Sequence, residues 1–319
     1  MMAAWARACL VTALSAVIWL HLLRTWQLYA LAAAFGTADA FDGPAAQAFM
    51  PFLVKPEGLV AASSASQVRT QLTSIVGPAP AGYIVKAVGL ASTFFIDAVS
   101  FLFLIGALLL LPDPPLTRSG EKAIWHSIWE GLRYVGRDIP LRSLMLVALG
   151  INLCLGGPVS LGLAYLAKTR FGSPAMLGMM FSSLAAGALC GALLAGIWKI
   201  RHRGIMILLI ALVLALLLGS LAMLNGRWTI PAVLFLMGVS GGMTNVQIGA
   251  WIMERIDPAV RGRVSSVLTL GAMGTMPISL ALAGLLIALS LKLMFLLAGS
   301  MMLLVTMAAA AQKTVRQIQ

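Results

Sequence analysis

Two acidic residues, Asp39 and Asp42, are the side chains of this sequence best suited to chemistry. They are the only charged residues between Trp26 and Lys55. On a helix, a spacing of three places two side chains at neighbouring positions of one face. At 1.5 Å per residue, both would lie roughly 20–24 Å from Trp26 and about as far from Lys55. The pair is therefore expected deep within a long apolar helix.

Carboxylates at such a depth in a membrane are costly, and those that occur usually face a cavity and carry protons or cations. Two neighbouring carboxylates also repel each other, which favours protonation of one of them. We therefore interpret Asp39 and Asp42 as candidate proton- or substrate-binding residues. The alternative is structural: two protonated, hydrogen-bonded acids that brace the bend expected at Gly43–Pro44.

A weak internal repeat relates this segment to the second half of the chain. An ungapped shift of 202 residues aligns Asp42 with Thr244, and Asn245 and Gln247 follow within the same turn. The loops that follow both segments would lie on the same side of a membrane, so the repeat is parallel. Since transporter sites lie near the midplane between repeats, Thr244, Asn245 and Gln247 join the candidates.

Four further features are weaker candidates. Gln47 and Asn152 are polar residues within apolar runs, and each could equally form a hydrogen bond between helices. Asp97, flanked by Thr93 and Ser100, is predicted to have a structural role. The run from Gly77 through Pro78 to Gly82 predicts a bend where two helices meet closely, because proline breaks backbone bonds and glycine permits close approach.

The composition requires a lipid environment for these residues. Of the 319 residues, 61% are hydrophobic and 10% are charged, with a mean hydropathy of +0.98. Soluble domains are about half apolar and about a quarter charged. Long continuous apolar runs favour helices over the short alternating strands of a membrane barrel. The sequence therefore predicts an all-α, polytopic transmembrane helix bundle.

About ten spans are expected, each of roughly 20 residues. They are predicted near 4–23, 27–53, 66–86, 90–112, 143–167, 174–198, 204–224, 229–254, 264–289 and 292–311. With the N-terminus inside, 16 of the 22 basic residues fall on the inner side and 6 on the outer side. This asymmetry follows the positive-inside rule and places both termini and the 113–142 connection in the cytoplasm.

The 113–142 connection divides the chain. Residues 1–112 form a predicted N-terminal bundle of four spans, and residues 143–319 form a C-terminal bundle of six. Apolar residues recur within the connection at helical spacing, which predicts a short amphipathic helix on the membrane surface. They are Ile124, Trp125, Ile128, Trp129, Leu132 and Val135.

Several function classes are excluded or left without support. The net charge of +12 reflects cytoplasmic loops, and no basic stripe with interleaved aromatics indicates nucleic-acid binding. The three cysteines and three histidines are scattered, so neither a metal site nor a disulfide framework is expected. No phosphate-binding GxxxxGK[ST] motif occurs, which argues against direct ATP hydrolysis. We expect no cofactor and no enzymatic activity.

Particular segments of the chain resemble a known family. The stretch FGTADAFDGPAAQAFMPFLV at 35–54, the later SIVGPAPAGYIV and FFIDAVSFLF, and SPAMLGMMFSSLAAGALCGALLAG at 173–196 resemble the major facilitator superfamily. Within it, they are most similar to bacterial exporters of the macrolide-efflux and siderophore-export type. The Gly77–Gly82 run resembles the antiporter motif of that family's fifth span.

The resemblance implies a twelve-span plan in which this chain's first span matches the family's third. The first two family spans and the acidic-basic loop motif after them have no counterpart, and Gln27–Leu31 lacks the family's basic residue. The N-terminal half would thus be incomplete. The chain's second, fifth and eighth spans would match three of the family's four cavity-lining spans, and one cavity wall would be open.

The leading interpretation is a secondary active exporter of the bacterial inner membrane, coupled to protons and working by alternating access on a drug- or siderophore-like molecule. Because of the open wall, the 319-residue chain alone is expected to transport poorly. It would pair with a partner subunit or belong to a longer protein of about 390 residues. The alternatives are a non-transporting remnant, a ten-span drug/metabolite-type transporter and a membrane enzyme.

Overall fold

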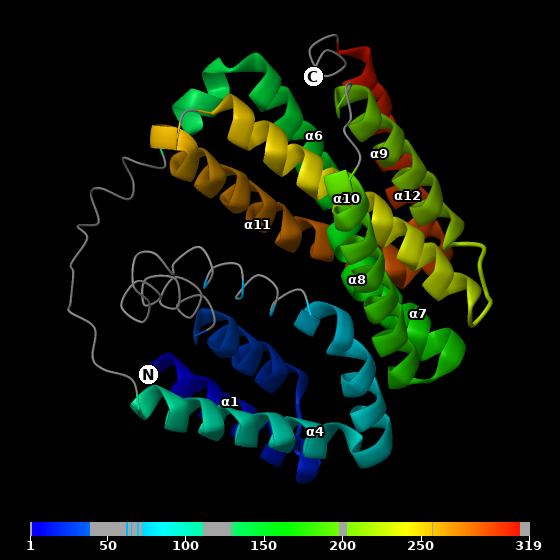
Figure 1. Cartoon of the computed structure of the whole chain (residues 1–319). Coiled ribbons are helices and arrows are strands. Elements are labelled where there is room, and N and C mark those ends of the chain that lie inside the picture. The colour runs from blue at the N-terminus through cyan, green and yellow to red at the C-terminus, as the bar shows by residue number, and fades with distance from the viewer. Residues whose placement is uncertain are drawn as a thin grey trace. The chain divides into compact units, whose positions relative to one another are not determined.

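The structure is a computed structural model that describes residues 2–38, 72–110, 131–197, 203–256 and 258–312, and the single positions 62, 65, 69 and 129. The chain divides into two compact units, Met1–Arg118 and Ser119–Gln319 (Figure 1). Within the described ranges all regular structure is helical and no strand occurs. The predicted all-α class is confirmed for this part of the chain.

Six helical segments of the described residues are long and apolar enough to cross a membrane. They are Pro78–Leu109, Ile139–Phe171, Pro174–Ile197, Thr229–Ile252, Val267–Leu289 and Leu291–Ala311. Two further apolar helices, Ala4–Trp19 and Gly204–Ser220, are shorter. The chain is thus a multi-pass helical membrane protein by the length and composition of its helices.

The N-terminal unit contains α1, Met2–Trp19, and α4, Pro78–Leu109, with a further helical stretch over 25–38. Helix α1 packs on α4 through a small apolar core. This core is made of Ala4, Ala8, Val11, Ala98, Phe101 and Ile105. Spacings of three and four put these residues on one stripe of each helix. The Ser15 hydroxyl also donates to the Ala91 carbonyl at 2.9 Å.

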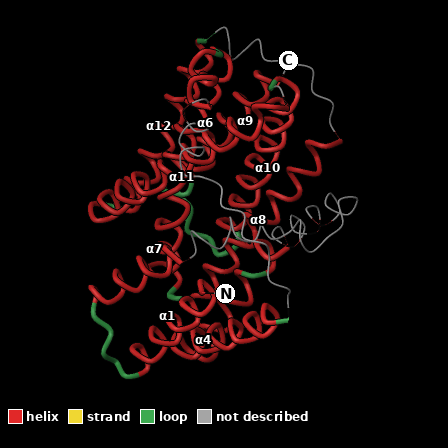
Figure 2. The backbone as a smooth tube through the Cα atoms, turned by 90° about the vertical axis from the view of Figure 1, so that its left-hand side faces the viewer, coloured by secondary structure: helices red, strands yellow, loops and turns green. Residues whose placement is uncertain are grey.

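Helix α4 is interrupted at Gly89, whose φ of 81° and ψ of 170° lie outside the helical region. Only glycine adopts this conformation without strain. The sequence predicted the end of one span at 86 and the start of the next at 90, so the interruption falls in the predicted connection. The tube view shows α1 and α4 side by side within this unit (Figure 2).

The C-terminal unit contains a continuous helical run followed by five helices. The run consists of α6, Ile139–Gly157; the π-helix η2, Pro158–Gly162; α7, Leu163–Leu166; and the π-helix η3, Ala167–Phe171. After it come α8, Pro174–Ile197; α9, Arg203–Ser220; α10, Thr229–Arg255; α11, Pro258–Leu289; and α12, Leu291–Ala311. Each corresponds to one predicted span of 143–319.

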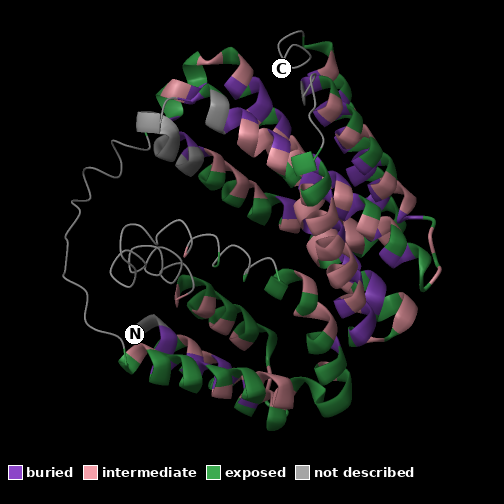
Figure 3. Ribbon diagram, viewed as in Figure 1, coloured by how far each residue is buried: buried purple, intermediate pink, exposed green. Residues whose placement is uncertain are grey.

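Helices α8 and α10, α9 and α12, and α6 and α11 form the closest pairs of this unit (Figure 1). Buried residues follow these contacts (Figure 3), and many large apolar residues of these helices are exposed. Leu193, Leu216 and Leu285 are each at least 60% exposed. Exposed apolar surface of this extent would promote aggregation in water and is suited to contact with lipid tails.

Helix α6 begins four residues before the predicted span. Asp138 caps it by accepting a hydrogen bond from the Leu141 amide at 3.1 Å, and Pro140 occupies the second helical position. Both residues are typical of a helix start. Of the predicted amphipathic segment, residues 131–137 are helical and Val135 is buried, whereas 113–128 lie outside the described residues.

Candidate functional site

A pocket of about 360 Å³ lies inside the C-terminal unit, between α6, η2, α8, α9 and α10. Most of its wall is apolar or glycine, as is common for sites that take small molecules. The residues that line it are Asn152, Leu155, Gly156, Val159, Ser160, Leu184, Ala188, Leu214, Met237, Gly238, Gly241, Gly242 and Asn245.

Three polar side chains interrupt this apolar wall. Asn152 on α6 and Asn245 on α10 are both exposed, and Ser160 on η2 is half-buried. The Asn152 side-chain amide donates to the Ala148 carbonyl at 2.9 Å, so its own carbonyl oxygen remains an acceptor. The pocket therefore offers neutral hydrogen-bonding groups on an apolar surface, and none of the described residues that line it is charged.

The α8–α10 side of the pocket depends on closely approaching backbones. A Cβ atom built on Gly238 would lie 2.0 Å from the Leu184 carbonyl oxygen, and one on Gly242 would lie 2.0 Å from that of Ala188. From the α8 side, Gly187 meets the backbone of α10 equally closely. Small residues allow such contact between membrane helices. Gly238 and Gly242 also line the pocket, so its wall carries no side chain at these two positions.

The α6 side of the pocket contains a change in helix geometry. Helix α6 ends at Gly157, and Pro158 starts the π-helix η2. Proline has no N–H group, so the ladder of backbone hydrogen bonds cannot continue unchanged. Ser279 of α11 contacts this point through its hydroxyl group. Lining residues come from both sides of the change, with Asn152 before it and Ser160 after it.

Of the residues predicted from the sequence, Asn152 and Asn245 are brought together in the pocket. Thr244 donates to the Ser240 carbonyl of its own helix at 3.0 Å and does not line the pocket. Gln247 is buried, with its amide nitrogen 3.5 Å from the Ala195 carbonyl of α8. Asp39, Asp42 and Gln47 lie outside the described residues.

Sequence reasoning missed Ser160 as a lining residue and Ser279 as its neighbour. A serine in an apolar helix is common and carries no sign of its partner. For Ser160, the signal that could have found it is its position eight residues after Asn152, which lies within the same broad stripe of a helix. For Ser279, the sequence contains no comparable signal.

The structural motif predicted in the N-terminal unit can be placed in part. Gly77 bends the chain just before Pro78 starts α4, and Gly82 is buried. Asp97 is exposed on α4, and the Ser100 hydroxyl donates to the Asp97 backbone carbonyl at 2.7 Å. The Thr93 hydroxyl donates instead to the Gly89 carbonyl at 2.8 Å, at the interruption of α4.

Arg7 of α1 lies between two aromatic rings of the same unit. Its guanidinium carbon is 5.4 Å from the centroid of the Phe35 ring and 5.2 Å from that of Phe101. Both distances are typical of cation–π contacts. A positive charge is thus held against the apolar core of this unit, where Phe101 belongs to the α1–α4 contact.

A family model described as "Transmembrane secretion effector", of the major facilitator superfamily, matches residues 1–319. The chain belongs to this family. Its members are membrane transporters and not enzymes, which confirms the predicted superfamily and the expected lack of enzymatic activity.

The multidrug efflux pump Tap of Mycobacterium tuberculosis is 30% identical to this chain over 264 residues, which cover 81% of the chain and 62% of Tap. The chain thus spans less than two thirds of the length of Tap. Macrolide efflux protein A of Streptococcus pyogenes is 23% identical over 304 residues, which cover 93% of this chain and 75% of that protein.

A solved structure described as that of a bacterial metal transporter has the same fold. Its TM-score is 0.67 at 16% sequence identity, and the match covers 97% of this chain and 82% of that chain. At this identity, the likeness shows the fold alone. The major facilitator assignment also favours this plan over that of the ten-span drug/metabolite transporters.

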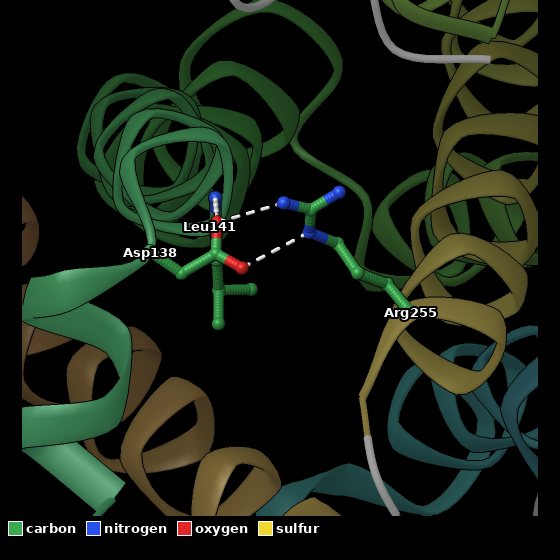
Figure 4. A network of polar contacts seen from close by, with 3 residues as sticks. All are labelled: Asp138, Leu141 and Arg255. Atoms are coloured by element: carbon green, nitrogen blue, oxygen red, sulfur yellow. Dashed lines mark hydrogen bonds and ion pairs between the residues drawn. The ribbon is translucent and has the colours of Figure 1, made fainter.

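In this family member, one ion pair joins two of the helices that line the pocket. Asp138, at the start of α6, accepts from Arg255, at the end of α10, at 3.0 Å and 3.3 Å (Figure 4). The Arg255 guanidinium carbon also lies 5.3 Å from the centroid of the Trp251 ring. The pair is partly exposed, so its contribution to stability is small. Its geometric effect is to hold these two helix ends together.

Proposed function

We propose that this chain is an exporter, or the main part of one, which moves a small, largely apolar molecule out of the cell by alternating access. The observation that carries the proposal is the pocket in which Asn152 and Asn245 meet on an apolar wall. In the family resemblance, α6 and α10 match the seventh and tenth spans, both of which line the transport cavity.

The pocket chemistry indicates the substrate class. Neutral amides and a hydroxyl suit a molecule with its own hydrogen-bonding groups, and the apolar wall suits its hydrocarbon parts. The relatives named for multidrug and macrolide efflux support a drug-like substrate for this chain. The metal named for the similar structure receives no support from the described residues that line this pocket, since none of them is a carboxylate, histidine or cysteine.

Proton coupling is the proposed energy source, with Asp39 or Asp42 as the proton carrier. Two acids three positions apart in an apolar stretch support it, as does Arg7, a positive charge held beside Phe35, four positions before Asp39 in the sequence. Replacement of each aspartate by asparagine keeps the shape and removes the charge. We expect at least one variant to lose the pH dependence of export.

That test separates coupling from structure. Export assays between pH 6 and 8 should be run on both variants, in a form of the protein that transports, with Asp97→Asn as the matched control. If both variants keep the pH dependence of the wild type, the pair is structural and another residue carries the proton.

The proposed architecture has ten spans, with both termini in the cytoplasm. Residues 1–112 would form the N-terminal bundle, 113–142 the cytoplasmic connection and 143–319 the C-terminal bundle. Support comes from the charge asymmetry of the sequence and from the division of the structure between Arg118 and Ser119. The bacterial plasma membrane is the proposed location.

Because the resemblance leaves one of four cavity-lining spans without a counterpart, we propose that the chain needs a partner subunit or a longer polypeptide for full activity. The opposing proposal, a non-transporting remnant, makes a different prediction. Both can be tested in bacteria that lack their main efflux pumps, by measuring the accumulation of ethidium and erythromycin with and without the chain.

Three outcomes of this assay are informative. Weak export by the 319-residue chain, enhanced when the two N-terminal spans of Tap are co-expressed, would support the partner proposal. Robust export by the chain alone would show that the partner is dispensable. Unchanged accumulation of both probes under either condition would contradict the proposed function and favour the remnant.

A further inference from the structure

A side chain from another helix bonds to the backbone of α6 at the end of that helix. The Gly157 backbone N–H donates to the Ser279 hydroxyl oxygen at 2.6 Å, and the same hydroxyl donates to the Leu153 carbonyl at 2.6 Å. In an uninterrupted α-helix, the Gly157 N–H would donate to the Leu153 carbonyl directly. The Ser279 hydroxyl therefore bonds to both backbone groups of one turn of α6.

The residues around this point make the contact possible. A Cβ atom on Gly157 would lie 2.2 Å from the Ser279 carbonyl oxygen and 2.6 Å from the Ala283 Cβ, so only glycine permits this approach of α11. Pro158 follows immediately and has no N–H for the Cys154 carbonyl. A side chain or water inserted into the ladder is a known cause of helix distortion.

The contact coincides with the change from α-helix to π-helix. Helix α6 ends at Gly157 and η2 begins at Pro158. A π-helix carries an extra residue per turn, so side chains after it are rotated relative to those before it. The pocket is lined by Asn152 before this change and by Ser160 after it. The relative direction of these two polar groups therefore depends on the geometry at Gly157.

We propose that Ser279 is a positioning residue for the pocket, which sets substrate preference without touching the substrate. Ser279 is 1% exposed and does not line the pocket. It acts through the backbone, because its hydroxyl bonds to the backbone at the α6–η2 junction and so sets where Ser160 lies relative to Asn152. The inference rests on the proposed function, since it assigns Ser279 a role in the selectivity of the same pocket.

Ser279→Ala removes the bridging hydroxyl and little volume. Thr275→Ala is the matched control, because Thr275 lies one turn earlier on α11 and its hydroxyl donates to the Ala272 carbonyl of the same helix at 2.9 Å. Ser279→Thr keeps a hydroxyl on the same Cβ atom and serves as the rescue variant. All variants are to be made in the full chain and purified in detergent.

Two measurements are needed. Hydrogen exchange of peptides over 153–162 reports the junction itself, and does so whether or not the protein transports. Binding of ethidium and of erythromycin, followed by the quenching of tryptophan fluorescence, reports preference as the ratio of the two dissociation constants. A loss of stability alone would weaken both ligands together and leave this ratio unchanged.

With Ser279→Ala, we expect exchange over 153–162 to become faster and the binding ratio to change, each by about fivefold, which is the usual effect of one hydrogen bond. Thr275→Ala should match the wild type, and Ser279→Thr should restore both quantities. Exchange over 153–162 equal to that of Thr275→Ala would overturn the inference. So would an altered exchange accompanied by an unchanged binding ratio.

The failure of the proposed function would look different. A wild-type chain that binds neither probe would count against the substrate class proposed for the pocket. In that case, the exchange data would still decide whether Ser279 stabilises the junction. Preference could then be read from other ligands of the same protein.

Discussion

At the scale of single residues, the pocket combines two asparagines contributed by different helices. Asn152 and Asn245 are 93 positions apart in the sequence, yet both line the same pocket, which has a volume of about 360 Å³. A side-chain amide can both donate and accept hydrogen bonds, so one site can bind molecules whose donors and acceptors are arranged differently.

Replacement of Asn152 or Asn245 by leucine tests this role. Each change should weaken binding of a hydrogen-bonding probe such as erythromycin by about five- to tenfold, because one hydrogen bond is lost and the apolar wall is retained. Equilibrium binding to the purified protein is the measurement. Asn225→Leu is the control, since Asn225 is exposed in the α9–α10 connection and outside the pocket. Equal binding of the probe by all three variants would show that neither asparagine contributes to binding.

Residue types alone predicted part of this site. Asn152 and Asn245 could be selected as candidates because side-chain amides are rare in long apolar runs. Gln247 stood out for the same reason, yet it lies buried beside the Ala195 carbonyl, because a sequence does not tell which side of a helix meets a neighbour. Ser160 and Ser279 could not be selected, since serine hydroxyls usually bond within their own helix.

At the scale of helices, the contact between α8 and α10 shapes one side of the pocket. Gly187, Gly191, Gly238 and Gly242 each meet a backbone carbonyl of the other helix at a distance that leaves no space for a Cβ atom. Between membrane helices, close packing replaces the hydrophobic effect as the source of affinity. Substitution of these glycines by alanine should therefore destabilise the folded protein more than the addition of one methyl group suggests.

Gly238→Ala tests this contact. The added Cβ would lie 2.0 Å from the Leu184 carbonyl oxygen, so the helices must separate, at an expected cost of about 1–3 kcal/mol. Thermal unfolding of the purified protein in detergent measures this as a lower Tm. Gly249→Ala, on the same helix with nothing within 4 Å of the added Cβ, should have no such effect. Equal Tm values for the two variants would contradict the packing argument.

The helices themselves were largely predictable and their irregularities were not. Continuous apolar runs located α8, α10 and α12 to within about two residues, because a span must be long enough to cross the bilayer. The early start of α6 was readable from Asp138 and Pro140, which are typical N-terminal residues. The π-helix η2 was not, because it depends on Ser279, which is 121 positions beyond Pro158 in the sequence.

At the scale of the whole molecule, the two units differ in how much of a transport site they contain. The described part of the C-terminal unit has six long helical segments, three of which pair closely with the other three, and α6, α8, α9 and α10 line an open pocket. The described part of the N-terminal unit has α1, the 25–38 helix and α4. In an alternating-access carrier, substrate lies between two bundles. The candidate pocket described above is formed by helices of the C-terminal unit.

The orientation of the chain in the membrane is the last prediction and follows from charge alone. Sixteen of 22 basic residues fall on one side when the ten predicted spans alternate, and loops rich in lysine and arginine stay in the cytoplasm. Reporter fusions after Lys313 and within 113–142 should both report the cytoplasm, and a fusion near Arg227, in the connection before α10, should report the outside.

A cytoplasmic signal near Arg227 would mean that α9 and α10 do not cross the membrane as two spans. A periplasmic signal at Lys313 would reverse the orientation or change the number of spans. A periplasmic signal at both Lys313 and the 113–142 fusion would reverse the orientation and place Asp138 and Arg255, whose ion pair joins the ends of α6 and α10, at the outer side.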